Sequence, residues 1–297
     1  MSDDMFEGTF VVAPRKTSVP TALTRPFLKW AGGKLRIVSE LKKKFPKTGK
    51  RFIEPFVGGG SVSLNVDYPE YIINDVNKDL TNVYCHLQTL GTDFIEKCRS
   101  LFTPENNTRE SFARLKKEFN TTQNSVKKSA LFIYLNRHCF NGLCRYNGKG
   151  EFNTPIGNYE KPYFPEKELI IALEKVKKFQ IKSGDFRDIF KLVTKGDVVY
   201  CDSPYLPLSE SSSFDDYSMG GFSLQSQIDL ARCASEASNR GATVVVSNHW
   251  NWYAREIYTN MFKAKITTLD VARTINCNAE KRKPVKEMIA VFKPEGQ

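Results

Sequence analysis

An apolar run that ends abruptly in polar residues is the feature of this chain that most constrains its fold. Residues 197–201 read Asp-Val-Val-Tyr-Cys, and Asp202-Ser203-Pro204-Tyr205 follows directly. A short continuous apolar run is typical of a strand that is buried on both faces of a parallel sheet. Open α/β sheets bind ligands at the carboxyl ends of such strands. The sequence therefore predicts an α/β fold with a ligand site at residues 202–205.

The four residues after this strand suit chemistry on an exocyclic amine. The Asp202 carboxylate can accept one hydrogen of an NH2 group, and the carbonyl of Ser203 can accept the other. Beyond the turn, the ring of Tyr205 can stack on the base that carries the amine. We therefore predict that Asp202, Ser203, Pro204 and Tyr205 are the catalytic residues of a methyl transfer to an amine.

Strand and helix patterns alternate on both sides of a long helical stretch. Strands are predicted at 52–56, 71–75, 179–183, 198–201 and 243–247, with helices at 34–45 and 224–239. Segments 265–273 and 287–292 read as a closing antiparallel hairpin. Between the two halves, helices are expected at 80–101, 111–119 and 126–137, followed by an irregular stretch to residue 165. We expect a flexible extension over 1–25, a core of 26–77 and 167–297, and an inserted, mostly helical domain over 78–166.

Two further segments favour a nucleoside-type cofactor. Gly58-Gly59-Gly60 follows a strand and is expected to open a helix, where backbone N–H groups face a ligand; a simple tight turn is the alternative. Asp75 ends the next strand, where an acid can accept both ribose hydroxyls; a helix N-cap is its alternative role. In Phe27–Lys34, a lysine can meet a carboxylate or phosphate, or the segment is a surface turn with Trp30 in the core.

The stretch from Arg137 to Pro155 mixes arginine, lysine, asparagine and aromatic residues. Arginine can contact guanine O6 and N7 with two hydrogen bonds, and aromatic side chains can wedge into a base stack. A long structured surface loop is the alternative. Ser247-Asn248-His249 ends another strand, and we interpret these residues as hydrogen-bonded polar groups beside the sheet, because neighbours in a strand point to opposite faces.

The charge of the chain favours an anionic partner. The 297 residues include 44 Lys+Arg against 33 Asp+Glu, a net charge of +11, which suits nucleic acid or an acidic membrane surface. The basic run 281–283 is interpreted as a solvated hairpin tip that touches phosphate. No apolar run approaches 18 residues, so no membrane span is expected. The seven scattered cysteines include no Cys-x-x-Cys pair, which predicts reduced thiols, no structural metal and a cytoplasmic location.

In this order, the motifs resemble the Dam family of GATC adenine-N6 DNA methyltransferases. The resemblance runs from about Arg25 to Pro294 and is carried by Phe27–Lys34, Phe56–Val62, Asn136–Phe152, the Lys-Pro-Tyr-Phe-Pro segment at 161–165, and the tetrapeptide at 202–205. The tetrapeptide is similar to the family's Asp-Pro-Pro-Tyr, with Ser203 where the first proline is usual. The resemblance implies S-adenosylmethionine as cofactor, double-stranded DNA as partner, and a target adenine that is flipped out of the duplex.

The resemblance also implies roles for individual residues. It assigns these residues to the cofactor: Trp30, Lys34, Phe56, Gly58, Gly60, Asp75, Asp185, Phe186 and Asp202. It assigns these to DNA: Lys29, Arg137, Phe140, Asn141, Leu143, Arg145, Pro155 and Tyr159. Among them, Arg145 reads a guanine, Leu143 and Pro155 contact thymine, Lys29 and Tyr159 contact the outer guanine, and Phe140-Asn141 intercalates. Phe140 replaces the family's tyrosine, and Asn158 stands where an arginine is familiar.

Two other functions stay open on the sequence. One is a catalytically impaired relative that binds GATC DNA and acts by occupying it, because Ser203 alters the motif. The other is a nucleotide-binding α/β protein that acts on RNA or on a small molecule. For the enzyme, we expect a monomer in solution, with more than one copy able to bind the same DNA.

Overall fold

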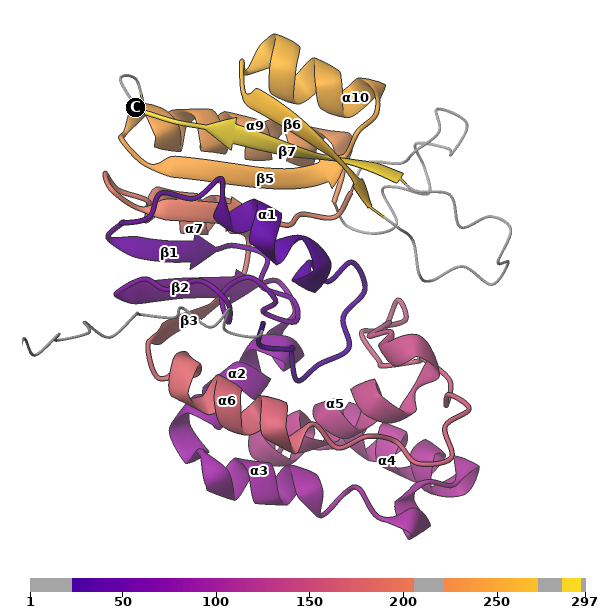
Figure 1. Cartoon of the computed structure of the whole chain (residues 1–297). Coiled ribbons are helices and arrows are strands. Elements are labelled where there is room, and N and C mark those ends of the chain that lie inside the picture. Colours follow the sequence, from indigo (N-terminus) through magenta and orange to yellow (C-terminus); the bar gives the residue numbers. More distant parts are fainter. Residues whose placement is uncertain (1–22, 206–221, 272–284, 295–297) are drawn as a thin grey trace, which may run out of the picture.

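The computed structural model describes residues 23–205, 222–271 and 285–294 (Figure 1). Within these residues the strands form a seven-stranded sheet in the order β3-β2-β1-β4-β5-β7-β6. The strands are β1 (Arg51–Glu54), β2 (Glu70–Asp75), β3 (Phe179–Ser183), β4 (Val198–Cys201), β5 (Thr243–His249), β6 (Lys265–Val271) and β7 (Val285–Phe292). β1 to β5 pair in parallel, whereas β7 is antiparallel to both β5 and β6. The predicted α/β fold with an antiparallel closing pair is confirmed.

The central strands are apolar throughout because both faces of the sheet are covered. Every residue of β4 is buried. Successive side chains of a strand point to opposite faces, so Val198 and Tyr200 join one hydrophobic cluster while Val199 and Cys201 join the other. The antiparallel edge strand β6 has alternating burial instead, as expected for a strand at the margin of the sheet.

The helices of the described residues cover both faces of this sheet. They are η1 (Leu35–Ile37), α1 (Val38–Lys42), α2 (Lys78–Leu90), α3 (Thr92–Arg99), η2 (Pro104–Asn106), α4 (Arg109–Thr121), α5 (Ser125–His138), η3 (Phe140–Gly142), α6 (Glu166–Val176), α7 (Phe186–Lys191), α9 (Leu224–Asn239), α10 (Trp252–Arg255) and η4 (Glu256–Met261). The predicted helix 224–239 matches α9, which Ser223 caps by accepting from Ser226 N–H. No helix in these parts of the chain is long and apolar enough to cross a membrane.

Three helix predictions were wrong in detail. Residues 55–66 form a series of turns instead of a regular helix, because Gly58 (φ 47°) and Gly60 (φ 72°) adopt left-handed conformations that a right-handed helix cannot continue. The expected helix 80–101 is divided into α2 and α3 at Gly91, whose φ is 56°. The expected helix 34–45 is a 3-10 turn followed by the short α1, which ends at Lys42.

The chain between β2 and β3 is mostly helical, and Figure 1 shows α2 to α6 gathered on the β3 side of the sheet. α5 is buried along most of its length, which explains why its apolar residues do not form a single stripe. Leu80 of α2 and Leu131 of α5 belong to the same hydrophobic cluster as Phe52 of β1. These helices therefore share a core with one face of the sheet, and the division into two domains stays a prediction.

Candidate active site

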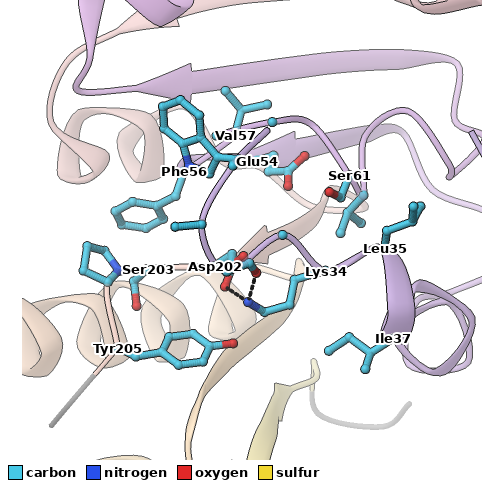
Figure 2. A pocket seen from close by; sticks show the side chains of 18 of the residues that line it. Lys34, Leu35, Ile37, Glu54, Phe56, Val57, Ser61, Asp202, Ser203 and Tyr205 are labelled. Atoms are coloured by element: carbon cyan, nitrogen blue, oxygen red, sulfur yellow. Dashed lines mark hydrogen bonds and ion pairs between the residues drawn. The ribbon is translucent and has the colours of Figure 1, made fainter. Parts of the chain in front are cut away.

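A cavity of about 820 Å³ opens at the carboxyl ends of β1, β2 and β4 (Figure 2). Its walls include residues 30–37, 75–76 and 202–205, parts of the turn 56–62, and the side chains of Glu54, His249 and Glu287. These segments are distant in sequence. They meet here because the carboxyl ends of neighbouring parallel strands lie at the same edge of the sheet. The ligand site predicted after β4 is therefore part of a cavity of ligand-binding size.

An ion pair between buried Lys34 and half-buried Asp202 lies in this cavity. The Lys34 ammonium is 2.9 Å from Asp202 Oδ1 and also donates to the carbonyl of Gly32. Figure 2 shows Lys34 directed at Asp202, with Tyr205 beside both. Lys34 is only 5% exposed. Burial raises the pKa of Asp202, and the neighbouring ammonium opposes that rise. Lys34, predicted to contact the cofactor, thus also stabilises the charge of the predicted catalytic carboxylate.

Tyr205 is held by side chains that the sequence did not connect with it. Its hydroxyl donates to Glu287 Oε2 at 3.2 Å, and its ring meets the ring of His249 edge-to-face, with centroids 4.7 Å apart. The Lys34 ammonium lies 4.5 Å from the Tyr205 centroid, as a cation–π contact. Glu287 and His249 lie on β7 and β5. Neither strand adjoins residue 205 in the chain, so no local signal could have predicted their contact with Tyr205.

Glu54 is a second buried carboxyl group of the cavity that sequence reasoning missed. It ends β1 and is 2% exposed. Its Oε2 accepts the N–H of Ser63 at 3.1 Å and also the Ser63 hydroxyl. Burial raises its pKa to about 8, and the nearby Asp202 and Asp75 carboxylates add to the rise. The signal in the sequence was an acidic residue within the apolar segment Phe52-Ile53-Glu54-Pro55-Phe56. Because an unpaired charge is rarely buried, an acid at such a position indicates a special environment.

Asp75 faces the cavity from the end of β2. Its carboxylate accepts the N–H of Gly58 at 3.1 Å and the N–H of Asn77 at 2.9 Å. Desolvation raises its pKa. The alternative role as helix cap is wrong, because the side chain of Asn77 caps α2. These contacts tie the acid to the glycine turn, and its role toward a ribose stays a prediction.

Glycine is required at positions 58 and 60 of the turn because neighbouring side chains of the protein leave no room for a Cβ atom. A Cβ on Gly58 would lie 2.6 Å from Trp30 Nε1, and a Cβ on Gly60 would lie 2.7 Å from the hydroxyl of Tyr84. Gly58 lines the cavity together with Trp30 and Phe56, whereas Gly60 does not. The turn is therefore packed tightly beneath Trp30, and Trp30 and Phe56 provide apolar walls.

Asp185 and Phe186 lie behind the cavity and do not line it. Asp185 is exposed, caps α7 and pairs with Arg187. Phe186 is buried against Phe56, with ring centroids 5.4 Å apart. Phe186 therefore supports a wall of the cavity, and direct contact of either residue with a cofactor stays a prediction.

The turn after Asp202 is fixed by a buried polar network. Gln227 of α9 donates from Nε2 to the carbonyl of Pro204 at 2.5 Å. Its Oε1 accepts from Asn248 and from the Tyr258 hydroxyl, both at 3.1 Å. Asn248 is thus a satisfied polar group, as interpreted from the sequence. The hydroxyl of Ser203 is also buried, and within the described residues it has no hydrogen-bond partner.

Most residues predicted to contact DNA lie on one exposed loop after α5. Phe140 is 48% and Leu143 41% exposed. Asn141, Arg145 and Pro155 are exposed as well. The Nε of Arg145 donates to the Asn153 side chain at 2.8 Å, and the N–H of Phe140 donates to the Pro155 carbonyl at 2.9 Å. We call residues 140–159 the recognition loop.

The recognition loop is joined to the segment that precedes the cavity. The Lys29 ammonium lies 4.0 Å from the centroid of Tyr159, so the structure brings together two residues assigned to the same guanine. Arg137 behaves differently from its prediction. It is 8% exposed and donates to the carbonyl of Phe27. Because its guanidinium is occupied in the interior, we leave Arg137 out of the DNA contacts that we propose.

The sequence of this chain matches a known protein family. Residues 30–275 match the model of the D12 class of N6 adenine-specific DNA methyltransferases. The chain belongs to this class. It is 42% identical over 270 residues to the DNA adenine methylase of Escherichia coli K12, covering 91% of this chain and 96% of that protein. The corresponding values for the DNA adenine methylase of Serratia marcescens are 43%, 91% and 98%.

A third relative, the DNA adenine methylase of Vibrio cholerae, is 41% identical over 271 residues. Among solved structures, a precorrin-8w decarboxylase aligns with a TM-score of 0.37 and 11% identity, too low to carry an argument. The D12 match includes the cavity residues from Trp30 to Tyr205 and the whole recognition loop. The family predicted from the motifs is therefore confirmed, and the chain is a methyltransferase of the DNA-adenine type.

Proposed function

We propose that this D12-class enzyme transfers a methyl group from S-adenosylmethionine to N6 of adenine in GATC duplex DNA, with the target base flipped into the cavity. The position of Asp202 carries this proposal. The carboxylate lies in the cavity at the end of β4, paired with Lys34 and next to Tyr205. An acceptor beside an aromatic ring is the arrangement that an aromatic amine requires.

The cavity has the groups that the cofactor would need. Asp75 would accept the ribose hydroxyls, and Trp30, Phe56 and Val57 provide apolar walls. The half-buried Asp202 carboxylate suits a ligand that carries positive charge. When bound, S-adenosylmethionine supplies an electrophilic methyl group on a sulfonium ion. Asp202 would place the target amine next to it.

The residues of the chain act chiefly by positioning. The lone pair of an adenine N6 is delocalised into the ring, so the free amine is a weak nucleophile. Hydrogen bonds from the amine to Asp202 and to the Ser203 carbonyl would favour a pyramidal nitrogen whose lone pair is available. The Lys34 ammonium favours the charged form of Asp202. Because these groups are fixed before substrate arrives, little reorganisation remains for the reaction itself.

Recognition of DNA is assigned to the recognition loop and to Lys29. Phe140 and Asn141 would enter the base stack, and exposed Arg145 would contact a guanine. The target N6 cannot meet the cavity while the base is stacked, so flipping is required. The net charge of +11 favours the phosphate backbone of the duplex.

The decisive test is methyl transfer to short duplexes with labelled S-adenosylmethionine. A duplex with one GATC site should accept label as N6-methyladenine, identified by mass spectrometry of the nucleosides. A duplex with the permuted site GTAC, and a GATC duplex already methylated on both strands, are the matched controls and should accept little. Equal labelling of the GATC and GTAC duplexes would refute the sequence specificity, and label on another base would refute the reaction.

The alternative of a GATC-binding protein without activity rests on Ser203, which replaces a proline that would restrict the backbone. Ser203→Pro tests it beside the parent chain. Comparable transfer by both proteins supports the enzyme. A silent parent with an active Ser203→Pro variant would favour the binding protein.

A further inference from the structure

Strand β7 brings an acidic side chain to the cavity from the far end of the chain. Glu287 pairs across the sheet with His249 of β5, and both residues line the cavity next to Tyr205. The reaction as proposed above assigns no role to either residue. Their position therefore calls for an explanation beyond the closing of the sheet.

The contacts of this pair converge on the Tyr205 ring. Glu287 Oε2 accepts the Tyr205 hydroxyl hydrogen at 3.2 Å. His249 meets the ring at an interplanar angle of 78°, and Lys34 lies 4.5 Å from its centroid. A phenol ring can rotate about the bond that joins it to Cβ. Because the O–H group prefers to lie in the plane of the ring, an acceptor fixed beside the hydroxyl favours one ring plane, and the His249 contact limits the rotation further.

We propose that Glu287 is a positioning residue, which acts through the Tyr205 hydroxyl to set the plane of the ring for stacking on the flipped adenine. The proposal rests on the function proposed above. Stacking depends on the angle and offset between two rings. A small misplacement of a reacting group reduces the rate strongly, so a residue that fixes the plane contributes to kcat even without touching the substrate.

A carboxylate is well suited to this role. Hydrogen bonds to an ionised acceptor are shorter and stronger than those between neutral groups. The phenol stays protonated and remains a donor, because burial and the neighbouring Asp202 carboxylate hold the pKa of Tyr205 well above its ordinary range. Glu287→Gln keeps an acceptor oxygen in the same place, so it should retain most of the effect that Glu287→Ala loses.

A purely structural role for Glu287 predicts something different. In that case Glu287→Ala would lower stability or cofactor affinity, and it would do so whether or not the Tyr205 hydroxyl is present. The two explanations therefore separate in a double-mutant cycle of Glu287→Ala with Tyr205→Phe, which removes the hydroxyl but keeps the ring.

The experiment measures single-turnover transfer to the GATC duplex, the melting temperature, and cofactor binding by calorimetry for the parent, both single variants, the double variant and Glu287→Gln. A parallel readout is the fluorescence of 2-aminopurine at the target position. Thr268→Ala, on the exposed face of β6, is the control. We expect Glu287→Ala to slow transfer by roughly 10- to 100-fold, with altered 2-aminopurine emission and unchanged cofactor affinity.

In the Tyr205→Phe background, the same substitution should change the rate less than about twofold, because its target is already gone. Equal losses in the two backgrounds, or emission identical to the parent, would overturn the inference. Failure of the proposed function is recognised separately, since the parent chain itself would then leave the GATC duplex unmethylated.

Discussion

The cavity and the recognition loop differ in how far their side chains are exposed: polar groups are buried in the cavity, and apolar groups are exposed on the loop. In the cavity, Lys34 and Glu54 are 5% and 2% exposed, and each has a defined protein partner. On the loop, Phe140 and Leu143 are 48% and 41% exposed. Chemistry on a weak nucleophile needs polar groups that are already desolvated and fixed. Recognition of a duplex needs side chains that protrude and can enter a groove.

This difference predicts that substitutions in the cavity and substitutions on the loop should have different kinds of effect. A change in the cavity should affect the rate or the stability of the protein steeply, because a buried group loses fixed partners. A change on the loop should leave both nearly intact and should affect the choice of DNA sequence. The following variants test that division, beginning with the largest expected effect.

Asp202→Ala should reduce the rate of methyl transfer by about 10²- to 10³-fold, the usual cost of removing one preorganised polar group. DNA affinity should change little, because the recognition loop is intact. Single-turnover kinetics and fluorescence anisotropy with a labelled duplex measure the two effects. Asp188→Ala, an exposed aspartate on α7, is the control. Near-parental turnover in Asp202→Ala would contradict the catalytic assignment.

Glu54→Gln should change how stability depends on pH. The folded group keeps its proton up to about pH 8, whereas the unfolded group ionises near 4.5. Between these values the unfolded chain binds fewer protons, so the free energy of unfolding should fall as pH rises, by up to about 1.4 kcal/mol per pH unit. Below that window the contribution is fully present, and above pH 8 it is lost.

The Glu54→Gln variant should lack this slope, which denaturant titrations at several pH values would measure. Glu160→Gln, at an exposed position, should keep it. The same pH dependence in Glu54→Gln and in the parent would show that Glu54 ionises normally in the folded protein.

Arg145→Ala should weaken discrimination at one guanine of the site by about 1–3 kcal/mol. Methylation of duplexes with single substitutions in GATC measures it. The neighbouring exposed Lys149→Ala should instead alter affinity for all duplexes alike. A uniform loss from Arg145→Ala would identify this arginine as a backbone contact.

Ser203→Ala should have the smallest effect, a rise of about 1 kcal/mol in the free energy of unfolding. Its hydroxyl is buried and, among the described residues, has no partner, so removing it abolishes a desolvation cost. Chemical denaturation measures the change, with the exposed Ser100→Ala as control. A loss of stability would imply that the hydroxyl has a bonding role in solution.

Much of the core was predictable because its signals are local. An alternating pattern located β3 and an apolar run located β4 at their observed bounds, and the periodicity and end signals of 224–239 located α9. The left-handed glycines at 58 and 60 were not predictable as helix breakers in this position, since their conformation depends on the side chains of Trp30 and Tyr84 that pack on them. The burial of Arg137 likewise depends on the carbonyl of Phe27, 110 residues away.

The sequence by itself determined the α/β fold, the strand end that carries Asp202 and the family to which the chain belongs, because hydrophobic periodicity and short motifs are encoded in neighbouring residues. Only the tertiary structure decided which groups act on Asp202 and Tyr205. The partners Lys34 and Glu287 lie far from them in the chain. Such contacts arise from strand order and register, which juxtapose side chains that no local pattern connects.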